Sequence, residues 1–262
     1  MKELLFRILR EAGQVQKESF RKTHSIDIKE SISSVVTEVD LRCDQIISDA
    51  IRREFPTHNI LTEESGLTDH GSRFTWVIDP LDGTSNFAAG IPWFGVLIAF
   101  FENDLPILAG AYLPMDDLLY FAESGKGASL NGISLKIEHA VLRDSLVGFA
   151  IDYTEDVGFL NCGMNLYQLL IMNARNVRCT NSLVDLMMVA DGSMGGSINM
   201  CTKIWDIAAP WLIIRESGGT MRDVYNQELK FELGEKHILQ NYSIMAGFIP
   251  LLDEISIAQT KR

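Results

Sequence analysis

The sequence predicts a mixed α/β chain whose two halves are built differently. Up to about residue 140, two helical segments precede a series of short, apolar or alternating segments, which is typical of an α+β unit with an antiparallel sheet. From Ser145 onward, strand-like and helical segments alternate, which favours βαβ units. We therefore expect a boundary near residues 138–145, between an N-terminal α+β subdomain (1–140) and a C-terminal α/β subdomain (141–262).

Two helices are expected at the start of the chain. Apolar residues between Leu4 and Val15 recur every three or four positions with charged residues between them, which is the period of an amphipathic helix. A polar loop or short hairpin over residues 24–37 follows and carries Lys29. The apolar period resumes over Glu38–Phe55, and Pro56 is expected to end this second helix, which holds Asp40 in its first turn.

Short segments separated by turn residues predict the strands. In the first half they are Asn59–Thr62, Phe74–Ile78, Gly95–Phe101, Ile107–Tyr112, Leu118–Ala122 and Ala128–Leu130. In the second half they are Leu146–Ile151, Val177–Cys179, Ser197–Met200 and Ser243–Ala246, with helices expected at Leu160–Asn173, Leu183–Asp191 and Ile207–Glu216.

Composition narrows the class of protein. A hydrophobic fraction of 47% over 262 residues is enough for a sizeable core. The formal net charge of −12 argues against a nucleic-acid or anionic-membrane surface, since both require basic residues. An acidic chain suits a protein that gathers cations.

The cysteines and the N-terminus indicate a cytoplasmic protein. Cys43, Cys162, Cys179 and Cys201 are widely spaced without a C-x-x-C pair, so we expect reduced, mostly buried thiols. Charges interrupt the apolar residues of the first turn, so no signal peptide is indicated. No window approaches the ~18 apolar residues of a spanning helix, and we expect no membrane association.

The segment Trp76–Phe87 reads Trp-Val-Ile-Asp-Pro-Leu-Asp-Gly-Thr-Ser-Asn-Phe. A strand delivers Asp79 and Asp82 into a turn that Pro80 makes rigid, and Gly83 then lets backbone amides approach a ligand. Carboxylates are ligands of hard divalent cations, whereas amides that open a helix hold anions. The segment therefore predicts a site that joins metal ions to a phosphate.

Other acidic residues fall at the ends of expected elements. Glu63 follows a strand, and Asp206 opens a helix whose Pro210 would leave the Asp206 carbonyl without its helical donor. A helix cap or turn residue is the ordinary alternative for each, and for Asp206 alone this alternative stays open. Asp40 is the candidate partner for a proton relay through the Thr84 hydroxyl.

Four segments together resemble the inositol monophosphatase family, in order and at the family's spacing over residues 29–219. They are Glu63-Glu64-Ser65, Trp76–Phe87, Gly125-Lys-Gly-Ala-Ser-Leu-Asn131-Gly132 and Trp205-Asp206-Ile-Ala-Ala-Pro, the last followed by Glu216-Ser-Gly218-Gly219. The resemblance implies a layered αβαβα sugar-phosphatase sandwich with the metal site between two subdomains. It also implies a lithium-sensitive, Mg²⁺-dependent phosphomonoesterase and a homodimer.

The resemblance assigns roles to individual residues. Glu63, Asp79 and the Leu81 carbonyl would hold a first Mg²⁺, and Asp79, Asp82 and Asp206 a second; a third ion is often proposed near Glu63. Gly83, Thr84 and Ser85 would bind the phosphate. Glu63 and the Asp40–Thr84 pair would orient and deprotonate a water that attacks phosphorus in line, without a covalent phosphoenzyme. Lys29 matches a loop lysine that reaches the site.

The chain departs from the family pattern where the substrate is chosen. Thr180-Asn181-Ser182-Leu183 replaces a Gly-(Ser/Thr)-Ala-Ala segment, and Asn199 replaces a glutamate that binds ring hydroxyls. Ser182, Leu183 and Asn199 are thus candidate substrate contacts. Inositol 1-phosphate is the first substrate to test, and fructose 1,6-bisphosphate, histidinol phosphate and 3′-phosphoadenosine 5′-phosphate are alternatives. A non-catalytic, metal-binding regulatory protein is the alternative from another class.

Overall fold

The computed structural model describes the chain apart from residues 23–25, 29–34, 139 and 261–262. Lys29, which was predicted to reach the site, lies outside the described residues. No helix among the described residues is long and apolar enough to span a membrane.

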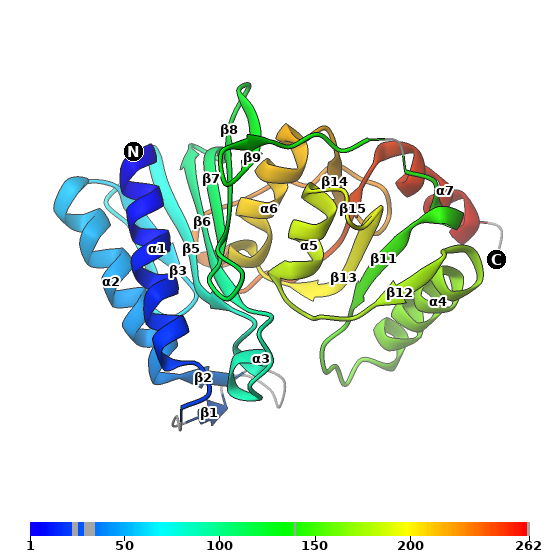
Figure 1. Cartoon of the computed structure of the whole chain (residues 1–262), viewed down its shortest axis with the longest axis horizontal. Coiled ribbons are helices and arrows are strands. Elements are labelled where there is room, and N and C mark those ends of the chain that lie inside the picture. The colour runs from blue at the N-terminus through cyan, green and yellow to red at the C-terminus, as the bar shows by residue number, and fades with distance from the viewer. Residues whose placement is uncertain (23–25, 29–34, 139, 261–262) are drawn as a thin grey trace.

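The described residues form five layers, which Figure 1 shows from left to right. Helices α1 (Lys2–Ser19) and α2 (Glu38–Glu54) cover one face of an eight-stranded sheet. Helices α5 (Leu183–Ala190) and α6 (Ile204–Glu216) lie between this sheet and a five-stranded sheet. The outer layer consists of α4 (Val157–Asn173) and α7 (Ile249–Thr260). The expected αβαβα sandwich is confirmed.

The larger sheet is antiparallel except at one pair, where β3 runs parallel to β5. Its order is β10 (Ile133–Ser134), β9 (Gly127–Leu130), β8 (Leu118–Glu123), β7 (Leu105–Leu113), β6 (Gly95–Glu102), β5 (Phe74–Asp82), β3 (Asn59–Thr62) and β4 (Gly66–Thr68). A separate hairpin, β1 (Ile26–Ile28) and β2 (Val35–Thr37), precedes α2.

The smaller sheet is mixed. Its order is β12 (Asn176–Arg178), β11 (Leu146–Ala150), β13 (Gly196–Thr202), β15 (Tyr242–Gly247) and β14 (Thr220–Asp223). Strand β11 is parallel to both of its neighbours, as the expected βαβ units require. Strands β14 and β15 are antiparallel additions, so the α/β pattern ends at β13.

The middle layer explains the apolar composition of α6. Ten of its residues are buried, because one side of the helix packs on the larger sheet and the other side on the smaller sheet. A helix that is apolar all round is typical of such a position. In contrast, α1 buries a single stripe that includes Leu5, Ile8 and Leu9 and exposes its charged residues.

Several elements were not expected from the sequence. Strands β4 and β10 are only three and two residues long, which leaves little periodic signal. Helix α6 begins at Ile204 and not at Ile207, and α7 buries Leu251, Leu252 and Ile255 on the smaller sheet. All four cysteines are free, but the expectation that most are buried is wrong, since only Cys43 is buried.

Candidate active site

Strand β5 delivers Asp79 and Asp82 to the end of the larger sheet. The strand continues past Ile78 to Asp82, so the expected turn is an irregular strand end. Asp79 pairs with Leu97 and Asp82 with Gly95, and the register shifts between these pairs. Pro80 cannot donate to a ladder, which suits a bulge. Asp79 is 2% exposed, and its Oδ1 accepts from the amide of Leu81 at 3.0 Å.

Gly83 turns the chain from β5 into the short helix α3 (Thr84–Ala88). Its φ of 85° lies in the left-handed region, and a Cβ here would sit 2.5 Å from the carbonyl oxygen of Trp93. Only glycine fits this approach without a shift of backbone. The turn brings Thr84 and Ser85, which were predicted to bind phosphate, to the lining of a cavity.

The structure brings Thr84 together with Asp40. The Thr84 hydroxyl lies 2.8 Å from Oδ1 of Asp40 and 3.0 Å from the carbonyl oxygen of Leu81. Asp40 is fully buried in the first turn of α2, where Oδ2 accepts from the amide and the hydroxyl of Thr37 at 2.9 and 2.5 Å. The capping bonds of α2 therefore fix the carboxylate that faces Thr84.

Asp82 connects the larger sheet to the middle layer. Its Oδ1 accepts from the amide of Leu183, the first residue of α5, at 2.5 Å. Ser182 caps this helix with its own hydroxyl, which accepts from the amide of Val184 at 3.3 Å. The positive end of the helix dipole favours a carboxylate at this position. The contact between Asp82 and Leu183 was not expected from the sequence.

Asp206 reaches the same place from α6, but not as the cap that the sequence suggested. Because α6 begins at Ile204, Asp206 is the third helical residue, and Lys203 occupies the cap position. Oδ2 of Asp206 accepts from the Thr202 hydroxyl at 2.6 Å and from the Lys203 amide at 2.7 Å. Pro210 lies four residues later and has no amide hydrogen for the Asp206 carbonyl.

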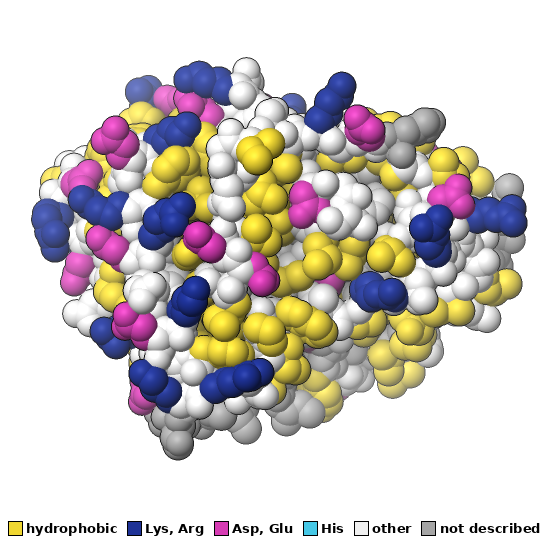
Figure 2. Space-filling model, in the orientation of Figure 1, with side chains coloured by type: hydrophobic (Ala, Val, Ile, Leu, Met, Phe, Trp, Pro, Cys, Tyr) yellow, Lys and Arg dark blue, Asp and Glu magenta, His cyan; other side chains and the backbone are white. Residues whose placement is uncertain are grey.

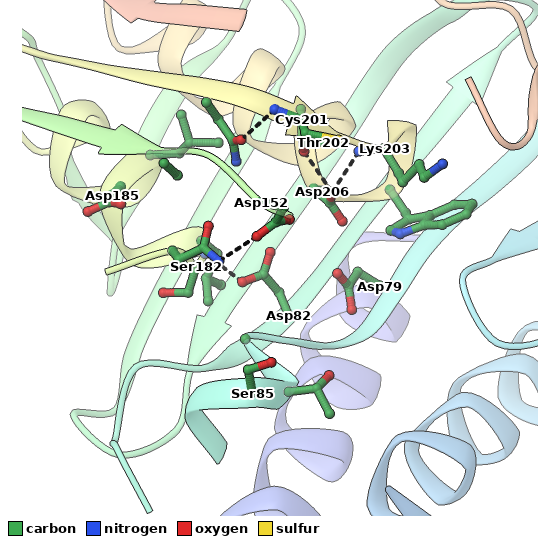
Figure 3. A pocket seen from close by; sticks show the side chains of 18 of the residues that line it. Asp79, Asp82, Ser85, Asp152, Ser182, Asp185, Cys201, Thr202, Lys203 and Asp206 are labelled. Carbon is green, nitrogen blue, oxygen red and sulfur yellow. Dashed lines mark hydrogen bonds between the residues drawn. The ribbon is translucent and has the colours of Figure 1, made fainter. Parts of the chain in front are cut away.

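Three carboxylates converge from two layers (Figure 3). Oxygen atoms of Asp79, Asp82 and Asp206 lie within 4.8 Å of one another. Burial raises the pKa of Asp79 well above its ordinary value, and the negative charges of Glu63, Asp82 and Asp206 add to this rise. Burial and the charge of Asp206 likewise raise the pKa of Asp82, against the Leu183 amide, which lowers it.

Such a donor set fits a divalent cation. Oxygen ligands from carboxylates are those that Mg²⁺ prefers, and a bound cation would offset the repulsion among the three acids. Glu63 lines the same cavity, as does Leu81, whose carbonyl is a metal ligand in the role that the family resemblance implies. All five predicted metal-ligating residues thus line one cavity, and the oxygen atoms of three of them converge.

The cavity extends from the acids toward the smaller sheet, with a volume of about 420 Å³. Ser182, Leu183 and Asn199, which the sequence proposed as substrate contacts, all line it. Asn199 lies on β13, where its Oδ1 accepts from the Cys201 amide at 3.1 Å, next to a register shift before Thr202. This bond orients the side chain at the cavity wall.

Several lining residues were missed by the sequence analysis. They are Asp152, Tyr153, Asp185, Lys203 and Asn241. Asp152 follows the carboxyl end of the parallel strand β11, a position where ligands bind in α/β sheets, so that rule would have found it. Burial raises the pKa of Asp152, whereas the amide of Asn181, which donates to Oδ1 at 2.9 Å, lowers it. Burial raises the pKa of Asp185 to about 6.

Known proteins share this sequence pattern and fold. The model of the inositol monophosphatase family matches residues 1–256. The chain is 34% identical over 212 residues to the fructose-1,6-bisphosphatase/inositol-1-monophosphatase of Aquifex aeolicus, covering 79% of each protein. It is 34% identical over 229 residues to the Nus factor SuhB of Escherichia coli K12, covering 85% of each.

Solved structures have the same fold as this chain. The extragenic suppressor protein SuhB of Bartonella henselae has a TM-score of 0.89 at 24% identity, covering 99% of this chain and 98% of that one. The IMPase of Thermotoga maritima has a TM-score of 0.86 at 26% identity, covering 100% and 98%.

Proposed function

Since the chain belongs to the inositol monophosphatase family of metal-dependent phosphatases, we propose that it hydrolyses the phosphate monoester of a small polyol or sugar with Mg²⁺, and that inositol 1-phosphate is its first substrate to test. The observation that carries this proposal is the convergence of Asp79, Asp82 and Asp206 in the lining of one cavity.

The metal ligands are proposed as the resemblance assigns them. Glu63, Asp79 and the carbonyl of Leu81 hold one ion, and Asp79, Asp82 and Asp206 hold another. Bound divalent cations supply Lewis-acid chemistry, because they make a water molecule more acidic and neutralise charge on a phosphoryl group. Two ions, or three with one more near Glu63, remain a prediction.

Asp40 and Thr84 are proposed to orient the attacking water. When the Thr84 hydroxyl donates to the buried Asp40 carboxylate at 2.8 Å, its oxygen presents lone pairs and not its proton to the cavity. A water molecule can then donate to Thr84 and pass a proton along this pair. Glu63, which lines the same cavity, would accept from the same water.

The start of α3 is proposed to hold the phosphate group. The backbone of Gly83, Thr84 and Ser85 enters this helix directly beside the three carboxylates. Amides at the first turn of a helix point toward a ligand and have no acceptor within the helix. A phosphate there would contact the cations on one side and the amides on the other.

Phosphate release from four compounds tests the proposal. The purified protein, with and without Mg²⁺, is given inositol 1-phosphate, fructose 1,6-bisphosphate, histidinol phosphate and 3′-phosphoadenosine 5′-phosphate. We expect Mg²⁺-dependent turnover with the highest kcat/KM for inositol 1-phosphate. A higher value for another compound would shift the substrate to one of the alternatives, and no turnover of any would refute the proposal.

An exclusively non-catalytic role is disfavoured. One relative is named a Nus factor, which keeps a second, partner-binding role open to test. However, the acids Glu63, Asp79, Asp82 and Asp206 and the Asp40–Thr84 pair are all present around one cavity. A chain that had lost catalysis would be expected to have lost some of them.

A homodimer is proposed from apolar residues next to the central motif. Ile91 and Trp93 are 37% and 42% exposed and are the proposed interface residues. Phe94 beside them is buried in the core and cannot contact a second subunit. Light scattering on the eluting protein should give twice the mass of 29.3 kDa, and a monomer would contradict this proposal. Sensitivity to lithium and a cytoplasmic location stay predictions.

Binding to nucleic acid is not proposed. On the face shown in Figure 2, Lys and Arg side chains alternate with Asp and Glu side chains over α1 and α2, and they form no continuous basic patch on that face. With a net charge of −12, this arrangement lacks the basic footprint that a nucleic-acid surface requires on that face.

A further inference from the structure

We propose that Asp152, oriented by Asn181, selects the alcohol part of the substrate by accepting hydrogen bonds from its hydroxyl or amino groups, and that it disfavours alcohols carrying a second phosphate. This inference rests on the proposed phosphatase function and identifies which class of monoester the same cavity prefers. Asp152, Asn181 and Asn199 form what we call the alcohol-side wall.

The position of Asp152 is what makes it a specificity residue. It follows β11 by two residues, and the last residue of that strand, Ala150, pairs with Asn199 on β13. The side chains of Asp152 and Asn199 both line the cavity. Figure 3 shows the Asp152 carboxylate beside those of Asp82 and Asp206. An ester whose phosphate lies at the start of α3 and at the metal ligands would therefore extend its alcohol toward Asp152.

Asn181 fixes the direction of this carboxylate. Its Nδ2 donates to Oδ1 of Asp152 at 2.9 Å, and its backbone has a φ of 51°, a left-handed conformation that asparagine tolerates. The preceding carbonyl of Thr180 accepts from Nδ2 of Asn86 on α3 at 2.9 Å. The orientation of Asp152 is thus tied to the helix that is proposed to bind the phosphate.

A carboxylate held in this way still has acceptor capacity. An ionised carboxylate offers about four lone-pair sites and no donor. The bond from Asn181 occupies one of these sites on Oδ1 and leaves Oδ2 pointing toward the cluster of acids in Figure 3. A hydroxyl or ammonium group of the substrate can donate to it, whereas a phosphate oxygen cannot.

The charge of the cavity supports the same preference. Once cations neutralise Glu63, Asp79, Asp82 and Asp206, Asp152 and Asp185 remain as acidic lining residues. Among the described lining residues Lys203 is the only basic one, and its ammonium donates to the carbonyl of Leu239 at 2.9 Å. A second phosphate on the alcohol would face like charge in a partly desolvated site.

The test compares two substrates in Asp152→Asn. Inositol 1-phosphate has hydroxyl donors beside the ester, whereas p-nitrophenyl phosphate has none. We expect the kcat/KM for inositol 1-phosphate to fall about 10- to 100-fold, the range for loss of a hydrogen bond to a charged group, and that for p-nitrophenyl phosphate to change less than about twofold. The ratio of activity on fructose 1,6-bisphosphate to activity on inositol 1-phosphate should rise.

Glu155→Gln is the matched control. Glu155 is exposed in the same loop and does not line the cavity, so neutralising it should leave the kcat/KM of both substrates unchanged. An equal loss with both substrates in Asp152→Asn would assign Asp152 to the metal or to the scaffold and overturn the proposal. No loss with either substrate would overturn it as well.

Binding without turnover separates this proposal from the proposed function. Inositol 1-phosphate and inorganic phosphate are titrated calorimetrically into the Ca²⁺-loaded protein. Asp152→Asn should weaken binding of inositol 1-phosphate about tenfold and leave that of inorganic phosphate unchanged. If the wild-type protein hydrolyses none of the substrates and the variant still loses affinity for inositol 1-phosphate alone, only the proposed function is refuted. If the variant weakens both or neither, the specificity role fails.

Discussion

The two walls of the cavity hold their polar side chains in different ways. The catalytic wall, formed by Asp79, Asp82 and Thr84, comes from six consecutive residues that Pro80 and Gly83 force into one conformation. The alcohol-side wall is assembled from three segments that meet only in the smaller sheet and the loop before α5. Rigid local geometry suits a reaction shared by a family, whereas a wall made of separate segments can change without disturbing that reaction.

The largest loss of activity is expected for a substitution of Asp82 in the catalytic wall. In Asp82→Asn the amide oxygen can still accept from Leu183, so the fold should persist, but the third carboxylate of the cluster is lost. We expect kcat to fall about 1,000-fold or more on every substrate, as for loss of a preorganised electrostatic group. Steady-state kinetics with circular dichroism as the folding control checks this. A loss confined to one substrate would place Asp82 with the alcohol-side wall.

Substitutions of Thr84 distinguish a catalytic role of its hydroxyl from a role of its backbone in phosphate binding. Thr84→Ala removes the bond to Asp40 and should lower kcat about 100-fold, within the range for a proton-transfer group, without a large change in KM. Thr84→Ser keeps the hydroxyl and should retain most of the activity. Equal activity of the alanine and wild-type proteins would leave the Asp40–Thr84 pair as a capping feature only.

Mg²⁺ should stabilise the catalytic wall measurably. A ligand present at 100 times its Kd raises the free energy of unfolding by about 2.7 kcal/mol, so the wild-type Tm should rise on addition of Mg²⁺. Asp82→Asn should have a higher Tm than wild type in EDTA, because repulsion with Asp206 is removed, and a smaller rise with Mg²⁺. Identical Mg²⁺ shifts in both proteins would argue against Asp82 as a ligand.

The smallest effect is expected behind the catalytic wall, at His58. Burial lowers its pKa, and its Nδ1 accepts from the indole N–H of Trp76 at 3.1 Å. The unfolded state binds the proton more readily than the folded state does. The contribution of neutral His58 to the free energy of unfolding is therefore fully present above the unfolded pKa of about 6.5 and is lost as the pH drops below it. The Tm of His58→Phe should depend less on pH between 7.5 and 5.5. An unchanged dependence would exclude His58 as its source.

Much of the catalytic wall could be predicted because its signals are local. Asp79, Asp82, Gly83 and Thr84 are close in sequence, and each residue type has a restricted conformational or chemical use there. The predicted end of β5 at Ile78 was wrong, because the strand continues to Asp82. A bulge in which Asp79 and Asp82 still pair with β6 cannot be distinguished from a turn by residue type. It also misplaced the start of α6, because Ile204 and Trp205 fit a strand as well as a first helical turn.

The alcohol-side wall could be predicted only in part: Asn199 was expected as a substrate contact, but its meeting with Asp152 and Asn181 was not. Asp152 and Asn181 lie in loops, and the parallel pairing of β11 with β13 and the left-handed turn at Asn181 bring them to the cavity; only the rule for the carboxyl ends of parallel strands would have drawn attention to Asp152. The contact between Asp82 and Leu183 likewise depends on how α5 is placed between two sheets. Such contacts are set by the packing of layers, and a single sequence carries no periodic signal for them.

The most direct test of the catalytic wall is an anomalous difference map from crystals grown with Mn²⁺ and inorganic phosphate. Mn²⁺ takes the oxygen ligands that suit Mg²⁺ and can be located by its anomalous scattering. We predict peaks bounded by Asp79, Asp82 and Asp206, with one toward Glu63, and phosphate density at the start of α3. Crystals that contain Mn²⁺ elsewhere but show no peak among these carboxylates would contradict the account.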